Sequence, residues 1–248
     1  MKIKTLCLSL VAALASAASF QASALPLVFN GTSGSMAATA SFQIVGGQLQ
    51  LTLSNSGTGD VLGPNDVLTG LFFSINGSPA LTALSAVTNG ATHLGTGLVS
   101  GAGANVGSEW AYAGGLSQYG ANMGISSTGV GLAGGGNLFS GSSSLVPPSL
   151  GGIAYGLATG PDNLSTGTGV VAHSALTQNA VTFLLGNLGA GFDLSNISNI
   201  TFQYGVGLGT HITLAVPPGG GTDVPEPATL TLLGAGLLGL AARRKRRV

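Results

Sequence analysis

Three histidines are the side chains of this 248-residue chain best suited to acid–base or metal chemistry: His93, His173 and His211. None has a second histidine or a carboxylate at the short spacing that zinc and hydrolytic metal sites use. A Ser-His-Asp triad is also unsupported, because no Gly-x-Ser-x-Gly elbow occurs and serine is too common to be informative. We therefore expect no catalytic residues and no resident metal or cofactor, and we expect His211 on the polar face of a strand.

A Gly/Pro turn offers a second possible ligand set. Asp60, Asn65 and Asp66 could gather oxygen atoms around Ca²⁺, but their spacing differs from that of an EF-hand loop. Asp and Asn are also favoured in turns for their local hydrogen bonds, and we prefer this explanation.

Aromatic side chains could offer flat faces to sugar rings. The candidates are Trp110, Tyr112 and Tyr119. Trp110 is the only tryptophan, and we expect it in the core rather than on the surface.

The charge distribution excludes nucleic acids and phosphate-cradling sites. The seven cations all lie at the two ends, and residues 5–242 hold all seven acids without one Lys or Arg. A phosphate backbone needs a basic face, and a P-loop needs its lysine. Two G-x-G-x-x-G matches, at 129–134 and 234–239, lack the strand–turn–helix context of a dinucleotide site in a chain with 43 glycines.

The elements that position these residues are predicted to be strands. Alternation of apolar and polar residues over 36–44 and 49–53, separated by Gly46-Gly47, predicts a β-hairpin. The same alternation, with one buried and one wet face, recurs at 67–75, 181–185, 200–204 and 212–216. No segment of the body shows a convincing helical stripe with caps, and 81–87 comes nearest to one; the Gly/Ser/Thr-rich stretch 95–169 predicts long loops. We expect an all-β fold, an antiparallel β-sandwich of jelly-roll-like form, flanked by an N-terminal signal helix and a short C-terminal transmembrane helix.

The N-terminus has the three parts of a secretory signal peptide. Lys2 and Lys4 precede an apolar run, 6–20, and Ala22-Ser23-Ala24 supplies the small residues that signal peptidase requires. Cleavage is expected before Leu25. Cys7, the only cysteine, would be lost with the signal, so the mature chain would have neither disulfides nor thiol chemistry.

The C-terminus is also tripartite. Val224-Pro225-Glu226-Pro227 is followed by the apolar run 228–242 and then by the cations Arg243, Arg244, Lys245, Arg246 and Arg247. At ~1.5 Å per residue the apolar run spans roughly 23 Å, which is short of the ~30 Å hydrocarbon core and indicates a marginal, transient inner-membrane anchor. The basic tail would stop translocation. Proline on both sides of Glu226 favours an extended segment, the form in which a protease binds a peptide.

This order of parts resembles the PEP-CTERM sorting signal of Gram-negative bacteria. The resemblance implies that a membrane-embedded exosortase recognises Pro225, Glu226 and Pro227 and removes the helix and tail, the catalytic residues belonging to the exosortase. Segments such as 109–112 and 202–205 are similar to an ectodomain that recurs in PEP-CTERM proteins and implies no activity. The predicted organisation is a signal peptide at 1–24, an ectodomain at 25–216, a Pro/Gly linker at 217–223 and the sorting signal at 224–248.

These observations predict an exported protein whose partners are the general secretion machinery, signal peptidase and exosortase, and whose destination is the cell surface or the medium. A surface of Ser, Thr, Asn, Gln and Gly without Lys or Arg suits a hydrated matrix and favours a structural or adhesive role in exopolysaccharide or biofilm. Two alternatives stay open. A carbohydrate-binding module predicts an exposed aromatic platform near Trp110 or Tyr119, and a secreted hydrolase predicts a cleft that joins a histidine to a carboxylate.

Overall fold

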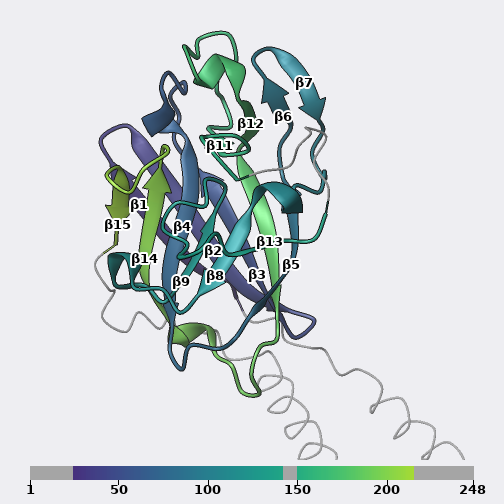
Figure 1. The fold of residues 1–248 in the computed structure, drawn as a ribbon, viewed down its shortest axis with the longest axis vertical. Coiled ribbons are helices and arrows are strands. Elements are labelled where there is room, and N and C mark those ends of the chain that lie inside the picture. The colour runs from purple at the N-terminus through teal and green to yellow at the C-terminus, as the bar shows by residue number, and fades with distance from the viewer. Residues whose placement is uncertain (1–24, 142–149, 215–248) are drawn as a thin grey trace, which may run out of the picture. The chain divides into compact units, whose positions relative to one another are not determined.

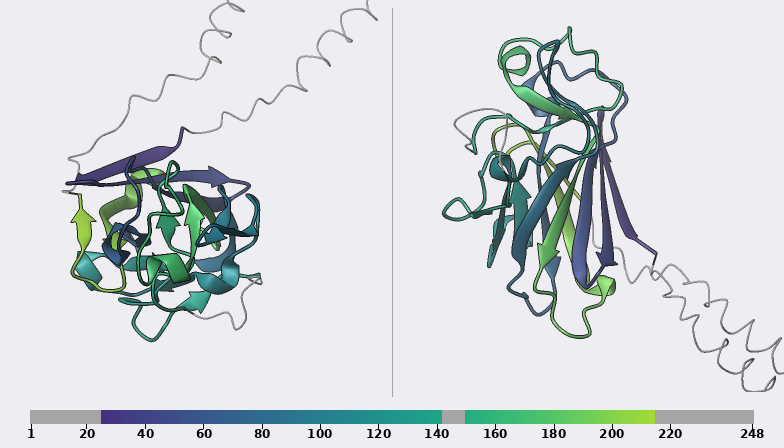
Figure 2. Two further views of the ribbon diagram at one scale, coloured as in Figure 1. Left: turned by 90° about the horizontal axis from the view of Figure 1, so that it is seen from above. Right: turned by 90° about the vertical axis from the view of Figure 1, so that its right-hand side faces the viewer.

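The computed structural model describes residues 25–141 and 150–214 and arranges them in two β-sheets (Figure 1). The side view in Figure 2 shows the sheets as two layers. The first sheet has the order β1-β2-β3-β13-β5, with bounds Leu27–Ser33, Met36–Val45, Gln48–Asn55, Ala180–Gly186 and Thr82–Thr88.

The second sheet has ten strands and curls into a half-barrel. Its main path is β10-β8-β9-β4-β11-β12-β6-β7, with β14 paired to β4 and β15 paired to β14. The bounds are Asn137–Leu138 (β10), Ala111–Gly114 (β8), Met123–Ser126 (β9), Leu68–Ile75 (β4), Leu157–Ala158 (β11), Ala175–Gln178 (β12), Thr92–Leu94 (β6), Gly97–Ser100 (β7), Ile197–Tyr204 (β14) and His211–Thr213 (β15). Short 3₁₀ helices lie at Pro64–Asp66, Gly107–Glu109, Gln118–Gly120, Val171–His173 and Leu194–Asn196.

The predicted hairpin is confirmed. β2 and β3 pair antiparallel from Ala38↔Asn55 to Val45↔Gln48. Gly46 and Gly47 have φ of 57° and 76°, the positive values that a two-residue hairpin turn with strand-matched twist requires. The apolar phase of both strands faces inward, so that Phe42 and the three β3 leucines are fully buried.

Aromatic side chains from both sheets meet in the core. Phe42 of the first sheet packs edge-on against Phe73 of the second, with ring centroids 5.4 Å apart. Phe183 of β13 contacts Trp110 and Phe139, at centroid distances of 5.0 and 5.2 Å. Trp110 is fully buried, as the sequence predicts. Because each large ring removes 150–250 Å² from water, this cluster supplies much of the stability that a body without Lys or Arg cannot draw from their ion pairs.

The expectation of one wet face is wrong for β4 and β14. Phe72 points away from the main core and packs with Ala121 and Leu132 in a second apolar cluster. Gln203 of β14 is also fully buried. The loops around 115–135 and 205–210 cover this outer side. Alternation of apolar and polar residues predicts a solvent-exposed face only where no other segment covers the sheet.

Three further expectations are corrected. The helix candidate 81–87 is strand β5, because its pairing with β13 overrides a short and ambiguous apolar pattern. The stretch 95–169 holds short strands β7 to β11 as well as loops. The sheets are not wholly antiparallel, since β11 and β12 pair in parallel. The mostly β, two-sheet expectation is confirmed, and the jelly-roll-like form stays a prediction.

The predicted terminal helices lie outside the described residues, as do the linker and the sorting segment. Within the described residues, no helix has the length and apolar character needed to cross a membrane.

Candidate functional site

The outer face of the five-stranded sheet carries rows of uncharged polar side chains, which we call the polar face. Strand alternation turns these residues away from the core, and strand pairing aligns them across the sheet. The rows are Asn30-Thr39-Ser54, Ser41-Thr52-Thr182 and Gln43-Gln50-Ser85, with the apolar Leu184 between Gln50 and Ser85 in the last row.

Each row contains one side-chain hydrogen bond between neighbouring strands. Thr39 Oγ1 donates to Asn30 Oδ1 at 2.8 Å, and Gln43 Nε2 donates to Gln50 Oε1. Thr52 and Thr182 share a hydroxyl bond of 2.9 Å, and Thr182 Oγ1 donates to Asn89 Oδ1 at 2.9 Å. A hydroxyl has one proton to donate, so Thr182 accepts from Thr52.

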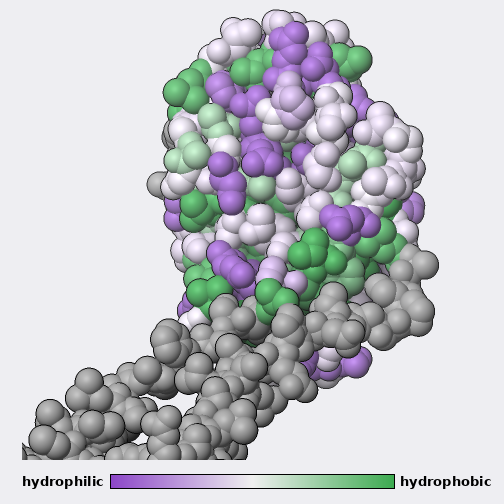
Figure 3. Space-filling model, turned by 180° about the vertical axis from the view of Figure 1, so that it is seen from behind, coloured by the Kyte–Doolittle hydropathy of each residue, from purple (hydrophilic) through white to green (hydrophobic). Residues whose placement is uncertain are grey.

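A groove of about 600 Å³ runs over one side of the polar face. The loop that forms its wall is fixed to β5, because Gly103 N–H donates to Thr88 O at 2.8 Å and Thr88 N–H donates to Ala104 O at 2.9 Å. Its lining has no Asp, Glu, Lys, Arg or His and consists of Gln50, Ser85, Val87, Thr88, Asn89, Ala102, Gly103, Thr182 and Leu184. Figure 3, seen from behind, shows mainly pale and purple surface broken by separate green patches. The groove therefore offers hydroxyl and amide groups, beside the apolar side chains of Val87, Ala102 and Leu184, to a neutral ligand.

Sequence reasoning did not find this groove, although the polar phase of the strands was visible. Gln50 and Thr52 alternate with the buried leucines of β3, which places them on the wet face. Their neighbour Thr182, however, is 130 residues further along the chain. The alternation of residues within β3 does not predict that β13 lies beside it.

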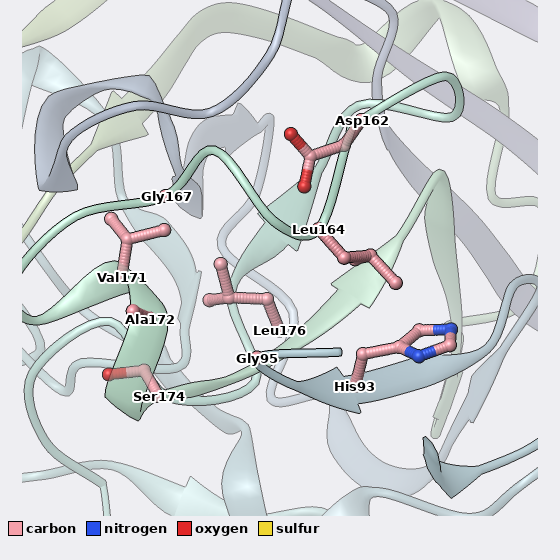
Figure 4. A pocket seen from close by; sticks show the side chains of 9 residues that line it. All are labelled: His93, Gly95, Asp162, Leu164, Gly167, Val171, Ala172, Ser174 and Leu176. Carbon is pink, nitrogen blue, oxygen red and sulfur yellow. The ribbon is translucent and has the colours of Figure 1, made fainter. Parts of the chain in front are cut away.

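A second, much smaller hollow holds a histidine and a carboxylate (Figure 4). Its volume is about 20 Å³, room for roughly one water molecule. His93 and Asp162 both line it, but in Figure 4 the Leu164 side chain lies between them and the two polar groups point in different directions. Asp162 Oδ1 accepts from Val61 N–H at 2.7 Å, so this carboxylate is engaged by the backbone. The arrangement is not the cleft that a hydrolase requires.

The electrostatics of this hollow are set by burial. Desolvation raises the pKa of Asp162, and the nearby negative charge of Asp60 raises it further, while the bond from Val61 N–H lowers it. Residues 5–242 contain no Lys or Arg, whose positive charge could lower the pKa of Asp162.

The acids of the Gly/Pro turn that was weighed as a Ca²⁺ site are bonded within the protein. Asp66 Oδ2 accepts from the N–H groups of Leu62 and Gly63, at 3.2 and 2.9 Å. Asp60 accepts from Asn163 N–H at 3.1 Å. These are the bonds that turn chemistry predicts. Within residues 25–141 and 150–214, no three or more His, Cys, Asp or Glu side chains group closely enough to hold a metal ion.

The other histidines are bonded to nearby carbonyl groups. His173 Nδ1 bonds Gly169 O at 2.8 Å, and His211 Nδ1 bonds Leu208 O at 3.1 Å. His211 is exposed, as the sequence predicts.

An aromatic platform at Trp110 is excluded by its burial, and Tyr112 is only 3 % exposed. Tyr119 is half-buried. Its ring lies against those of Phe72 and His211, and its hydroxyl donates to Leu208 O at 2.6 Å. Burial of the phenol raises the pKa of Tyr119. Its ring is therefore part of a packed cluster rather than a free flat face.

Comparison with known proteins identifies the C-terminal segment. Residues 223–247 match the family model described as the PEP-CTERM protein-sorting motif. The chain carries a PEP-CTERM sorting motif. No curated protein and no solved structure matches the chain.

The motif marks the chain as an exported protein that an exosortase processes and that is sorted at the membrane to the cell surface. The individual roles predicted for 224–227 and 243–247 stay predictions, as do those of Ala22, Ala24 and Leu25 at the signal-peptidase site. Of these residues, only Leu25 lies within the described part of the chain.

Proposed function

We propose that the sorted body is a non-enzymatic surface or matrix protein that contacts exopolysaccharide through the polar face. The observation that carries this proposal is the groove of about 600 Å³, whose polar lining is entirely hydroxyl, amide and backbone. Neutral sugars present the same hydrogen-bonding groups, and neither partner needs a counter-charge.

The charge balance of the body favours a neutral glycan over an anionic one. Residues 25–214 contain five acids and no Lys or Arg, the acids being Asp60, Asp66, Glu109, Asp162 and Asp193. A polyuronate would meet this negative body without a basic group to bind it. We therefore place the structural or adhesive role in a matrix that contains neutral polysaccharide.

This form of carbohydrate binding differs from that of an aromatic platform. Stacking on a flat ring gives affinity to a single site, whereas rows of hydroxyl and amide groups give weak contacts repeated along a polymer. A secreted hydrolase receives less support, because Asp162 and His93 do not point toward each other.

The proposal is tested by retention of the purified chain in gels that contain a neutral glucan, a polyuronate or the producing cell's own exopolysaccharide. We expect retention by the neutral glucan and none by the polyuronate. Replacing Thr52 and Thr182 together with valine removes the hydroxyl row and should abolish retention while the fold is kept, since Val has nearly the shape of Thr.

A matched control is available on the other sheet. Thr201 and Thr213 form a similar cross-strand hydroxyl pair, at 3.0 Å, outside the groove. Their double replacement with valine should leave retention unchanged. Equal loss in both double variants, or retention by the polyuronate alone, would contradict a role for the polar face.

Sorting is tested separately by fractionation of cells that carry Glu226→Ala and Pro227→Ala. We expect the variant chain to stay in the membrane fraction at precursor size, while the wild type is processed. The same size and fraction for both would count against the assigned recognition role of these residues.

A further inference from the structure

The five-stranded sheet has two different edges. At β5, the segment 103–106 closes the edge with backbone bonds, among them Val106 N–H to Ala86 O at 2.9 Å and Thr88 N–H to Ala104 O at 2.9 Å. At the opposite edge the strand order ends with β1 (Figure 1). Within the described residues, no strand pairs with the outer side of β1. Within residues 25–141 and 150–214, one edge of this sheet is thus covered and the other is open.

β1 has none of the features by which edge strands commonly avoid pairing. Its register with β2 runs from Leu27↔Phe42 to Ser33↔Met36 without a bulge. The strand, LVFNGTS, has no charged residue and no proline. Natural edge strands are usually protected by Lys, Pro or a bulge. An open, regular and uncharged edge is a template for one more strand.

We propose that β1 pairs antiparallel with β1 of a second copy of this chain, so that two five-stranded sheets join about a two-fold axis. Full overlap of the seven residues centres the pair on Asn30, which then faces Asn30 of the second copy. The same register places Phe29 opposite Gly31 and Val28 opposite Thr32.

The residues of β1 complement one another in this register. On the inner side, Phe29 is buried in its own core and the space over Gly31 is filled by Phe202 and Ile212 of the same chain, so the new contacts of this register lie on the outer side. On the outer side, Val28 is 46 % exposed and becomes covered by Thr32. Asn30 Oδ1 accepts from Thr39, and its amide N–H groups are donors for the second Asn30 across the axis. Because β1 is uncharged, identical strands do not repel each other.

The chain's own remaining segments are poorer occupants of this edge. Residues 215–221 read Ala-Val-Pro-Pro-Gly-Gly-Gly. The two prolines lack the N–H groups that a β-ladder needs, and glycine disfavours strands. Residues 1–24 are predicted to leave with the signal peptide. A second copy, by contrast, brings a strand of the same length and pattern.

Cysteine cross-linking tests both the contact and its register in the full chain, expressed with its own signal and sorting segments in an exporting bacterium. Asn30→Cys places two thiols directly opposite each other, at the ~4.5–5.5 Å Cα separation of antiparallel pairs, which is within disulfide range. Thr32→Cys is the matched control. Its partner position is four residues along the strand, roughly 13 Å away and beyond disulfide reach.

We expect a reducible dimer band on non-reducing gels for Asn30→Cys and none for Thr32→Cys. The Val28→Cys/Thr32→Cys double variant should restore the dimer. Unmodified chain is the control for Cys7 in the signal segment. Equal cross-linking of Asn30→Cys and Thr32→Cys, or none for Asn30→Cys, would overturn the proposed register.

The oligomeric state supplies an independent measurement. Light scattering of the detergent-solubilised chain should give a dimer for the wild type and a monomer for Asn30→Lys, because two lysines would then face each other across the axis. Circular dichroism should be the same for both. A monomeric wild type overturns the proposal, and this outcome does not depend on whether the polar face binds polysaccharide.

Discussion

Phe183 offers the most direct test of how this body is stabilised. Its side chain is fully buried and packs against Trp110 and Phe139. Replacing it with alanine removes a ring from a closely packed core and leaves a cavity, at a cost of about 3–5 kcal/mol. Domains of this size are stable by only about 5–15 kcal/mol. Phe183→Ala should therefore remove a large share of the total stability.

Urea unfolding of residues 25–216 measures this cost. With a slope near 2 kcal/mol per molar urea, the loss corresponds to a midpoint lowered by roughly 1.5–2.5 M. Trp110 is the only tryptophan and lies at the mutated site, so its fluorescence reports the opening of this part of the core, and far-ultraviolet circular dichroism reports the strands.

The neighbouring residue of β13 is the control. Thr182 points to the opposite face, and its replacement with alanine should cost about 1–2 kcal/mol, because it removes the two hydrogen bonds to Thr52 and Asn89. A Phe183→Ala midpoint within about 0.5 M of the wild type, or equal effects of the two changes, would refute the assignment of stability to the aromatic core.

Three further substitutions probe separate contacts. Gly31→Val should destabilise by about 1–3 kcal/mol in urea unfolding, because a Cβ there would lie 2.9 Å from the Phe202 ring; an unchanged midpoint would show that the sheets can separate freely. Asp162→Asn should stabilise by no more than about 0.5 kcal/mol at pH 7, because the partly exposed carboxyl is screened by solvent. Since the folded pKa of Asp162 is raised above 3.8, this advantage should fade as the pH falls through that pKa toward 3.8, where the wild type is also protonated; an advantage that grows with acidity would be the wrong sign. Asn55→Leu should cost about 1–3 kcal/mol, because the buried amide donates to Leu157 O at 2.9 Å and to Asp66 O at 3.1 Å; thermal melting that matches the wild type would argue against these bonds.

The sequence predicted those features that local pattern determines. The β2–β3 hairpin was visible from alternation around Gly46-Gly47, and the core position of Trp110 was expected of the only tryptophan. The sorting motif was visible because three distinct parts stand in order within 25 residues. In each case the deciding residues are neighbours in the chain.

The remaining features depend on contacts between distant segments. The segment of β5 did not show its strand character, because its partner β13 lies about 100 residues away. The outer face of β4 is covered by loops from other parts of the chain, so its own sequence could not show that this face is buried. The groove likewise needs Gln50, Thr182 and Asn89 to be brought together. The alternation of residues within one strand does not determine which strands lie beside it, so these features required the structure.

The hydroxyl row beside the groove also has a direction. Thr52 donates to Thr182, and Thr182 donates to Asn89, while Gln43 donates to Gln50 in the same sense across the sheet. Between β2 and β5 the bonds therefore leave amide N–H donors at the groove end, whereas Thr39 of β2 donates in the opposite sense, to Asn30 of β1. Polysaccharide chains have two unlike ends, so a chain bound along these two rows would favour one orientation, and the second copy across the proposed two-fold axis would bind a neighbouring chain in the opposite orientation.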